Sequence, residues 1–280
     1  MHNISKFIFA AILSSHAQPV LADGIYSFFE SQFVPARLIR NARTYLDSPI
    51  RIAIYNDLGT WTTGYNHLKM FLSDSKLSYQ TIDRADLYRG ILQEQTIDIL
   101  IMPGGESWTY LDTLGEVGAN SILNFISQGG GYLGICAGAF YAISDRHGGY
   151  HTGKYGIGLV TGVAYDGTSL GAEPFRVGML DFEIRYPGHA AQMKMVLLEG
   201  PSILVEPKEA ASIELRVVAR FPQSGQPAMT LSNYGQGRVF LSGPHPEIEE
   251  NLTGWGKNYE DPESDWPLLR AMIDEIAPDY

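Results

Sequence analysis

The chain has 280 residues, of which 45% are hydrophobic and 18% charged, so it is long enough for one sizeable globular domain with a buried core. Its formal charge of −11 argues against a surface that binds nucleic acid or anionic membranes. A single cysteine excludes an internal disulfide and leaves that thiol for chemistry, for packing or for dimerisation.

The first residues predict a secretory signal. The apolar run FIFAAILSSHA follows Lys6 and is too short to span a bilayer, and VLA at 20–22 offers the small residues that a signal peptidase reads. We therefore expect a signal peptide over 1–22, a lead-in over 23–49 and one domain over 50–280. The mature chain is then exported, periplasmic or secreted, with no membrane span. The alternative is a hydrophobic N-terminal helix of a cytosolic protein.

Strand-like and helical segments alternate through the first half of the chain. Continuous apolar runs that end in turn residues predict strands, and apolar residues at helical spacing predict amphipathic helices. The predicted strands are 51–57, 77–83, 97–105 and 131–136, and the predicted helices are 63–74 and 116–130. This alternation is typical of an α/β protein with a mostly parallel sheet covered on both faces.

The second half predicts a β-rich extension. Its segments are strand-like, separated by Gly and Pro turns, and we expect the last of them to return to the main sheet. The strand-like segments are 156–167, 179–186, 194–200, 212–221, 227–235 and 237–243, and a closing helix is predicted at about 265–276.

Cys136 stands where a predicted strand, GYLGIC, turns directly into a predicted helix, AGAFYAI. Gly134 and Gly138 flank it where a Cβ would collide with neighbouring elements, which is the nucleophile-elbow pattern with Cys in place of Ser. Free N–H groups at a helix start favour the reactive thiolate. The alternative is a cysteine that merely packs in a glycine-rich corner.

A base and an orienting carboxylate are offered by His245 and Glu247, in HPE just past an apolar strand. Residues i and i+2 of an extended chain face the same way, so the carboxylate can reach the imidazole. The alternative is a surface turn shaped by the flanking prolines. Oxyanion donors are expected from the N–H of Ala137 and from Gly104 and Gly105 at the end of another strand.

Weaker candidates for substrate contacts lie near these strand ends. Asn56 and Asp57 follow the first strand, Gly104 belongs to the glycine pair, Glu106 follows that pair, and Tyr141 belongs to the helix after the cysteine. For Glu106 a turn-shaping role is the alternative. We also expect the loop 145–156 to cover the pocket. No metal-ligand spacing or phosphate-binding loop stands out, so neither a metal nor a cofactor is predicted.

The motifs PGG (103–105), GICAG (134–138) and HPE (245–247) resemble those of the class I glutamine amidotransferase-like superfamily. LIMPGGESWTYLDTLG and GGGYLGICAGAFYA look like the domain at the N-terminus of eukaryotic biotin–protein ligases, and the resemblance covers roughly 50–250. It implies a flavodoxin-like three-layer sandwich. By position it also implies a nucleophile, a general base and acid, an orienter and two oxyanion donors, namely Cys136, His245, Glu247, Gly105 and Ala137.

The sequence thus predicts a cysteine-dependent hydrolase that cleaves a small-molecule or peptide amide, such as a carboxamide or γ-glutamyl bond. A non-catalytic ligand-binding or interaction domain of the ligase-associated family is the alternative, and a thiol-based redox protein is a third hypothesis. The ligase part with its Gly/Arg-rich loop is not found, so biotin ligase activity is not predicted. The sequence gives no indication of oligomeric state.

Overall fold

The computed structural model describes residues 50–94, 97–147, 153–165, 178–255, 261 and 263–278. The predicted signal peptide and lead-in fall on residues 1–49, outside the described residues, and remain predictions. None of the described helices has the length and apolar composition needed to cross a bilayer.

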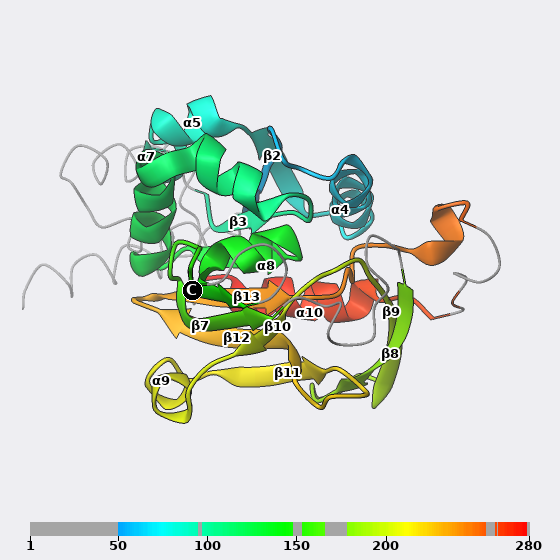
Figure 1. Cartoon of the computed structure of the whole chain (residues 1–280). Helices are drawn as coiled ribbons and strands as arrows, with labels where there is room; N and C mark the ends of the chain where they lie inside the picture. The colour runs from blue at the N-terminus through cyan, green and yellow to red at the C-terminus, as the bar shows by residue number, and fades with distance from the viewer. Residues whose placement is uncertain are drawn as a thin grey trace, which may run out of the picture. The chain divides into compact units, whose positions relative to one another are not determined.

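A nine-stranded mixed sheet forms the centre of the described chain (Figure 1). Its parallel half consists, in spatial order, of β2 (Ser78–Ile82), β1 (Arg51–Tyr55), β3 (Ile99–Met102), β4 (Gly131–Ile135) and β13 (Gly237–Ser242). The order 2-1-3-4-5 is that of flavodoxin-like sheets, with β13 as the fifth strand. The predicted fold class is thereby confirmed.

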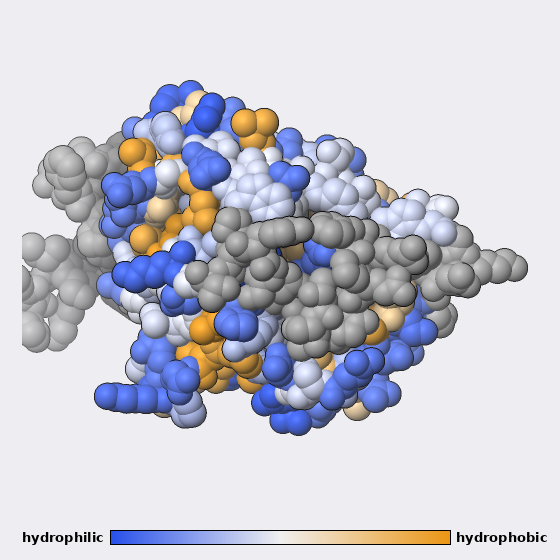
Figure 2. Space-filling view, viewed as in Figure 1, coloured by the Kyte–Doolittle hydropathy of each residue, from blue (hydrophilic) through white to orange (hydrophobic). Residues whose placement is uncertain are grey.

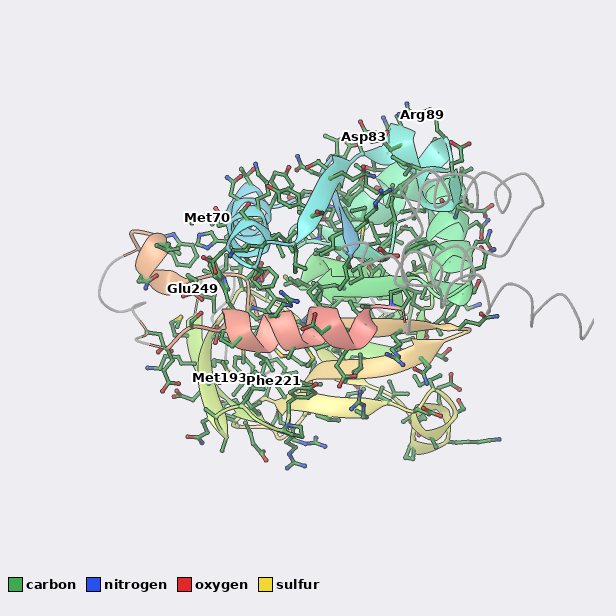
Figure 3. The ribbon with its side chains drawn as sticks, turned by 180° about the vertical axis from the view of Figure 1, so that it is seen from behind. Met70, Asp83, Arg89, Met193, Phe221 and Glu249 are labelled. Carbon is green, nitrogen blue, oxygen red and sulfur yellow. The ribbon has the colours of Figure 1, made fainter. Side chains whose placement is uncertain are left out.

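The antiparallel half contains four strands of the predicted β-rich extension, whereas its segment 156–167 forms part of a second sheet. It continues the sheet beyond β13 with β12 (Pro227–Tyr234), β11 (Arg216–Arg220), β8 (Gly178–Ile184) and β9 (Gln192–Leu197). The last strand of the chain therefore returns to the parallel half and pairs with β4. Met193 and Phe221 of this extension lie beneath α10 (Trp266–Ile276) in Figure 3 and belong to the same apolar core.

Helices cover both faces of the parallel half because its strands are apolar on both sides. Along β1, Ile52 and Ile54 face one core, whereas Ala53 and Tyr55 face the other. The first core is closed by α4 (Thr62–Asp74) and α10, which crosses in front of the sheet in Figure 3. The second core is closed by α5 (Arg84–Tyr88), α6 (Ile91–Glu94), α7 (Ser107–Ser127) and α8 (Ala137–Ala142).

A second sheet of four strands lies beside α8. Its order is β10 (Ser202–Leu204), β7 (Val160–Tyr165), β5 (Ile143–His147) and β6 (Gly153–Lys154). Figure 2 shows a largely hydrophilic face on which apolar side chains gather over α7 and around β7 and β10. The loop expected over 145–156 is therefore partly strand, and its residues 148–152 lie outside the described part of the chain.

Several element boundaries differ from the sequence prediction. The helix expected at 116–130 begins at Ser107 instead, and a kink at Gly115, with φ of +51°, separates the earlier turns from the predicted stretch. The segment expected as a strand over 212–221 is a strand only over Arg216–Arg220, because α9 (Pro207–Ser212) precedes it. A short 3₁₀ turn, η2 (Glu250–Leu252), follows the HPE segment.

The central strand β4 gives a test of the core. Leu133 is fully buried between β3 and β13, so Leu133→Ala should lower the free energy of unfolding by about 2–5 kcal/mol. Val117 on α7 is 58% exposed, and Val117→Ala should change that free energy by less than about 0.5 kcal/mol. Urea denaturation of both variants measures the difference, and equal losses would contradict this packing.

Candidate active site

Four loops meet at the carboxyl edge of the parallel strands. They follow β1, β3, β4 and β13, and they contain the segments 56–61, 103–106, 136 and 243–247. The direction of strand order reverses between β1 and β3, which is where open α/β sheets leave a crevice for ligands. The three motifs PGG, GICAG and HPE are therefore brought to one edge.

Cys136 occupies a strained corner between β4 and α8. Its φ is +50° and ψ −103°, and its N–H donates to the Ser242 carbonyl oxygen at 2.7 Å. A Cβ at Gly134 would lie 2.7 Å from the Gly138 carbonyl oxygen, and one at Gly138 would lie 2.1 Å from that of Met102. Both flanking positions therefore require glycine, as the sequence pattern predicted.

His245 and Glu247 form a fully buried pair. His245 Nδ1 lies 2.8 Å from Glu247 Oε1, and neither side chain is exposed to solvent. The His245 N–H donates to the Val196 carbonyl oxygen at 2.8 Å, which ties the segment to β9. Glu247 Oε1 reaches the first turn of α4, where a Cβ at Gly64 would come within 3.0 Å of it. The positive end of that helix stabilises a buried carboxylate.

Cys136 and His245 border the same glycine. A Cβ at Gly104 would lie 2.6 Å from His245 Cε1 and 3.5 Å from Cys136 Cβ. The Cys136 thiol itself donates to the Leu198 carbonyl oxygen at 3.4 Å. His245 Nε2 is buried and has no hydrogen-bond partner within the part of the chain that the structure describes, while the Trp61 ring packs edge-on against the imidazole at 5.1 Å. The structure thus brings nucleophile and base candidates together without bonding them.

The surroundings shift the pKa values of the two buried histidines, His245 and His67, in opposite directions. Burial alone lowers the pKa of His245, but the Glu247 carboxylate and the neighbouring Cys136 sulfur outweigh it and raise the pKa to about 10. For His67 of α4 burial wins over the Glu247 and Glu249 carboxylates, and its pKa is lowered. His67 Nδ1 accepts the Glu249 N–H at 3.3 Å, on the side of α4 where Glu249 and Met70 are seen in Figure 3.

The N–H groups of Gly105 and Ala137 have no acceptor among the described residues. Gly105 pairs with Thr60 in an antiparallel bridge, in which the Trp61 N–H donates to the Gly104 oxygen and the Glu106 N–H to the Gly59 oxygen. In such a bridge the N–H of Gly105 itself points away from Thr60. Its φ of +145° and a Cβ position only 1.9 Å from the Gly59 oxygen exclude other residues.

A cavity of about 660 Å³ opens over these groups. Cys136 and His245 lie in its wall together with aromatic and charged side chains, namely Trp61, Trp108, Phe140, Glu106, Arg146 and Glu199. The Arg146 guanidinium stacks over the Phe140 ring at 4.3 Å and donates to the Tyr155 hydroxyl at 3.4 Å. Within the described residues no cluster of three or more His, Cys, Asp or Glu side chains could hold a metal ion.

Some predicted substrate contacts lie elsewhere. Asn56 is exposed outside the cavity, and the Asp57 carboxylate accepts the N–H groups of Leu58 and Arg84, which shapes the loop instead. Gly104 is buried against His245 and serves close packing. Tyr141 is fully buried in the second core, so the expected substrate contact of this side chain has no access to the cavity. Among the substrate-contact candidates, Glu106 lines the cavity. The predicted oxyanion donor Gly105 and the predicted nucleophile Cys136 line it as well.

Sequence reasoning missed the cavity residues Trp61, Phe140 and Glu199, whereas Arg146 falls in the segment 145–156 expected to cover the pocket. Trp61 had a usable signal, because it follows the first strand in the same loop as Asp57. Glu199 had none, since the turn after β9 reaches the cavity only through tertiary pairing.

The fold and the site define a class I glutamine amidotransferase-like α/β domain. A crystal structure of a glutamine amidotransferase superposes with a TM-score of 0.55 at 20% sequence identity, over 80% of this chain and 97% of the other. This likeness shows the shared fold.

Within that class the chain belongs to the biotin–protein ligase N-terminal family, whose profile matches residues 50–266. An uncharacterized protein of Chlamydia muridarum is 29% identical over 212 residues, which are 70% of this chain and 80% of that protein. The biotin–protein ligase of Schizosaccharomyces pombe is 25% identical over 168 residues, 54% of this chain but only 25% of the ligase. The chain therefore matches a minor part of that enzyme.

The charge states of the two histidines can be tested by NMR of the ¹⁵N-histidine-labelled protein. At pH 7 we expect His245 as the imidazolium and His67 as the neutral imidazole, since their pKa values are shifted up and down from 6.5. Glu247→Gln removes a carboxylate that raises the pKa of His245, so the imidazolium should lose its proton at lower pH than in the wild type. A wild-type His245 that is already neutral at pH 7 would contradict the paired arrangement.

Proposed function

We propose that the protein is a cysteine-dependent amidohydrolase with Cys136 as nucleophile, His245 as general acid and base, and Glu247 as the group that orients and charges the imidazole. One observation supports it above the others: the only cysteine of the chain borders the same glycine as a buried imidazole that is paired with a buried carboxylate. A core cysteine that only fills space needs no such partner.

The first half of the reaction is acyl transfer to sulfur. Transfer of the Cys136 thiol proton to His245 Nε2 gives the thiolate and the imidazolium. The thiolate attacks the amide carbonyl carbon, so that a C–S bond forms and the carbonyl π electrons move to oxygen. The N–H groups of Gly105 and Ala137 are placed to bind that oxyanion. The imidazolium of His245 then gives its Nε2 proton to the amide nitrogen, the C–N bond breaks, and the amine leaves behind a thioester.

The second half is hydrolysis. Neutral His245 takes a proton from water as the water oxygen attacks the thioester carbon, and the same two N–H groups bind the second oxyanion. When this intermediate collapses, the C–S bond breaks, sulfur leaves as thiolate and the carboxylic acid product departs. His245 is again the imidazolium, and Glu247 stabilises that charge throughout.

The size and lining of the cavity favour a larger amide substrate, either a small molecule or a peptide, over a simple carboxamide. Its volume of about 660 Å³ is in the range of sites for drug-sized ligands. Trp61, Trp108 and Phe140 offer flat apolar walls. Arg146 offers a positive charge, and Glu106 and Glu199 offer negative charges. A γ-glutamyl compound, which carries an amine and a carboxylate beside its amide, suits such a lining.

A non-catalytic binding domain is the second candidate. It is favoured by the resting geometry, in which the Cys136 thiol donates to the Leu198 carbonyl oxygen and His245 Nε2 is unbonded. Cys136 is also only 7% exposed. This candidate accounts less well for the buried His245–Glu247 pair, which costs desolvation energy and has no structural need for a cysteine beside it.

Alkylation and turnover separate the two candidates. Because Cys136 is the only cysteine, iodoacetamide reports on it alone, and we expect rapid labelling at pH 7 that slows by about tenfold or more in His245→Ala, where the imidazolium that stabilises the thiolate is lost. Hydrolysis of γ-glutamyl-p-nitroanilide, or of glutamine, should disappear in Cys136→Ala.

His189→Ala is the matched control. His189 packs against Tyr186 next to the β8–β9 hairpin, outside the cavity wall, and its loss should change neither rate. Turnover that survives Cys136→Ala would refute the hydrolase, and slow labelling of the wild type would support the binding domain.

A further inference from the structure

Tyr110 of α7 sends its hydroxyl under the PGG loop. The ring is fully buried and is held edge-on between Tyr55 at 5.4 Å and Tyr141 at 6.1 Å. The hydroxyl lies 3.2 Å from the Pro103 carbonyl oxygen, 3.3 Å from that of Gly104 and 3.3 Å from Thr60 Oγ1. It therefore contacts the loop from the buried interior, and Tyr110 itself is not among the residues that line the cavity.

These carbonyl groups connect the two oxyanion candidates. The Pro103 oxygen also accepts the Gly138 N–H at 3.1 Å, which ties the loop to the first turn of α8 and so to Ala137. The Gly104 oxygen also accepts the Trp61 N–H at 2.9 Å. The Tyr110 hydroxyl thus contacts two carbonyl groups: that of Pro103, which binds α8, and that of Gly104, which binds Trp61.

The direction of the Gly105 N–H depends on these contacts. In a planar trans peptide the C=O and the N–H point in opposite directions, so holding the Gly104 oxygen toward Trp61 and Tyr110 aims the Gly105 N–H the other way. Rotation of this peptide changes ψ of one residue and φ of the next, and two glycines resist it least. Without the contacts to Trp61 and Tyr110, the peptide can rotate so that the Gly104 oxygen takes the place of the Gly105 N–H.

We propose that Tyr110 is a positioning residue, whose hydroxyl holds the Gly104–Gly105 peptide so that the Gly105 N–H can stabilise the oxyanion. This inference rests on the proposed acyl transfer to Cys136 and adds a residue to its machinery that touches neither substrate nor thiol. Burial raises the pKa of Tyr110, which keeps its hydroxyl protonated and able to donate at neutral pH.

The test compares two reactions of Cys136. Acylation by p-nitrophenyl acetate passes through an oxyanion, whereas alkylation by iodoacetamide displaces iodide and forms none. In Tyr110→Phe we expect the acylation rate, read from p-nitrophenolate release, to fall about tenfold while the alkylation rate stays unchanged. A merely structural role would move both rates or neither.

Tyr141→Phe is the matched control. It removes the same atom from a neighbouring buried tyrosine, whose hydroxyl has no hydrogen-bond partner among the described residues. Its ratio of acylation to alkylation should equal that of the wild type.

The outcomes distinguish this inference from the proposed function. Equal ratios in Tyr110→Phe and Tyr141→Phe, with acylation still abolished by Cys136→Ala, would overturn the role of Tyr110 and leave the hydrolase standing. Wild-type acylation no faster than that of Cys136→Ala would overturn the proposed function and, with it, this inference.

Discussion

The site depends on a carboxylate and an imidazole that are both withdrawn from water. Burying either charge alone would be strongly unfavourable, so Glu247 and His245 have to be paired in the folded chain. Their approach is possible because glycine stands at positions 64 and 104, where a side chain would strike Glu247 or His245. The same pairing sets the charge of His245, since the carboxylate offsets the desolvation that burial imposes.

The strand order explains why distant segments can supply one site. β1 and β3 are parallel neighbours in the sheet, but the chain continues from β1 to β2 on one side and from β3 to β4 on the other. The loops that follow β1 and β3 therefore separate and leave a crevice. β13 arrives beside β4 only after the chain has built the antiparallel extension. The extension therefore has a role at the site as well, because β9 accepts the His245 N–H through Val196.

Local patterns predicted the parts of the site that local geometry determines. The corner at Cys136 and the i, i+2 pair of His245 and Glu247 follow from short-range sterics, and the parallel strands follow from continuous apolar runs. The predictions of substrate contacts failed where they depended on which way a side chain points from its helix or loop. Tyr141 shares a helix with the cysteine corner but faces the second core, and Asp57 uses its carboxylate within its own loop. Glu199 depends on long-range pairing that no local pattern encodes.

Backbone groups, rather than side chains, occupy most of the close approaches around Cys136. The Cys136 N–H is held by Ser242, the Gly138 N–H by Pro103, and the Gly104 oxygen by Trp61. Glycine is required at positions 104, 134 and 138 because the opposing atom is a carbonyl or a ring that cannot move aside. Glycine also leaves the peptides free to turn, so the loop needs a fixed partner on its buried side. A rigid, fully buried tyrosine that contacts two successive carbonyls meets that need, and on this ground we propose a positioning role for the Tyr110 hydroxyl in a reaction in which it takes no direct part.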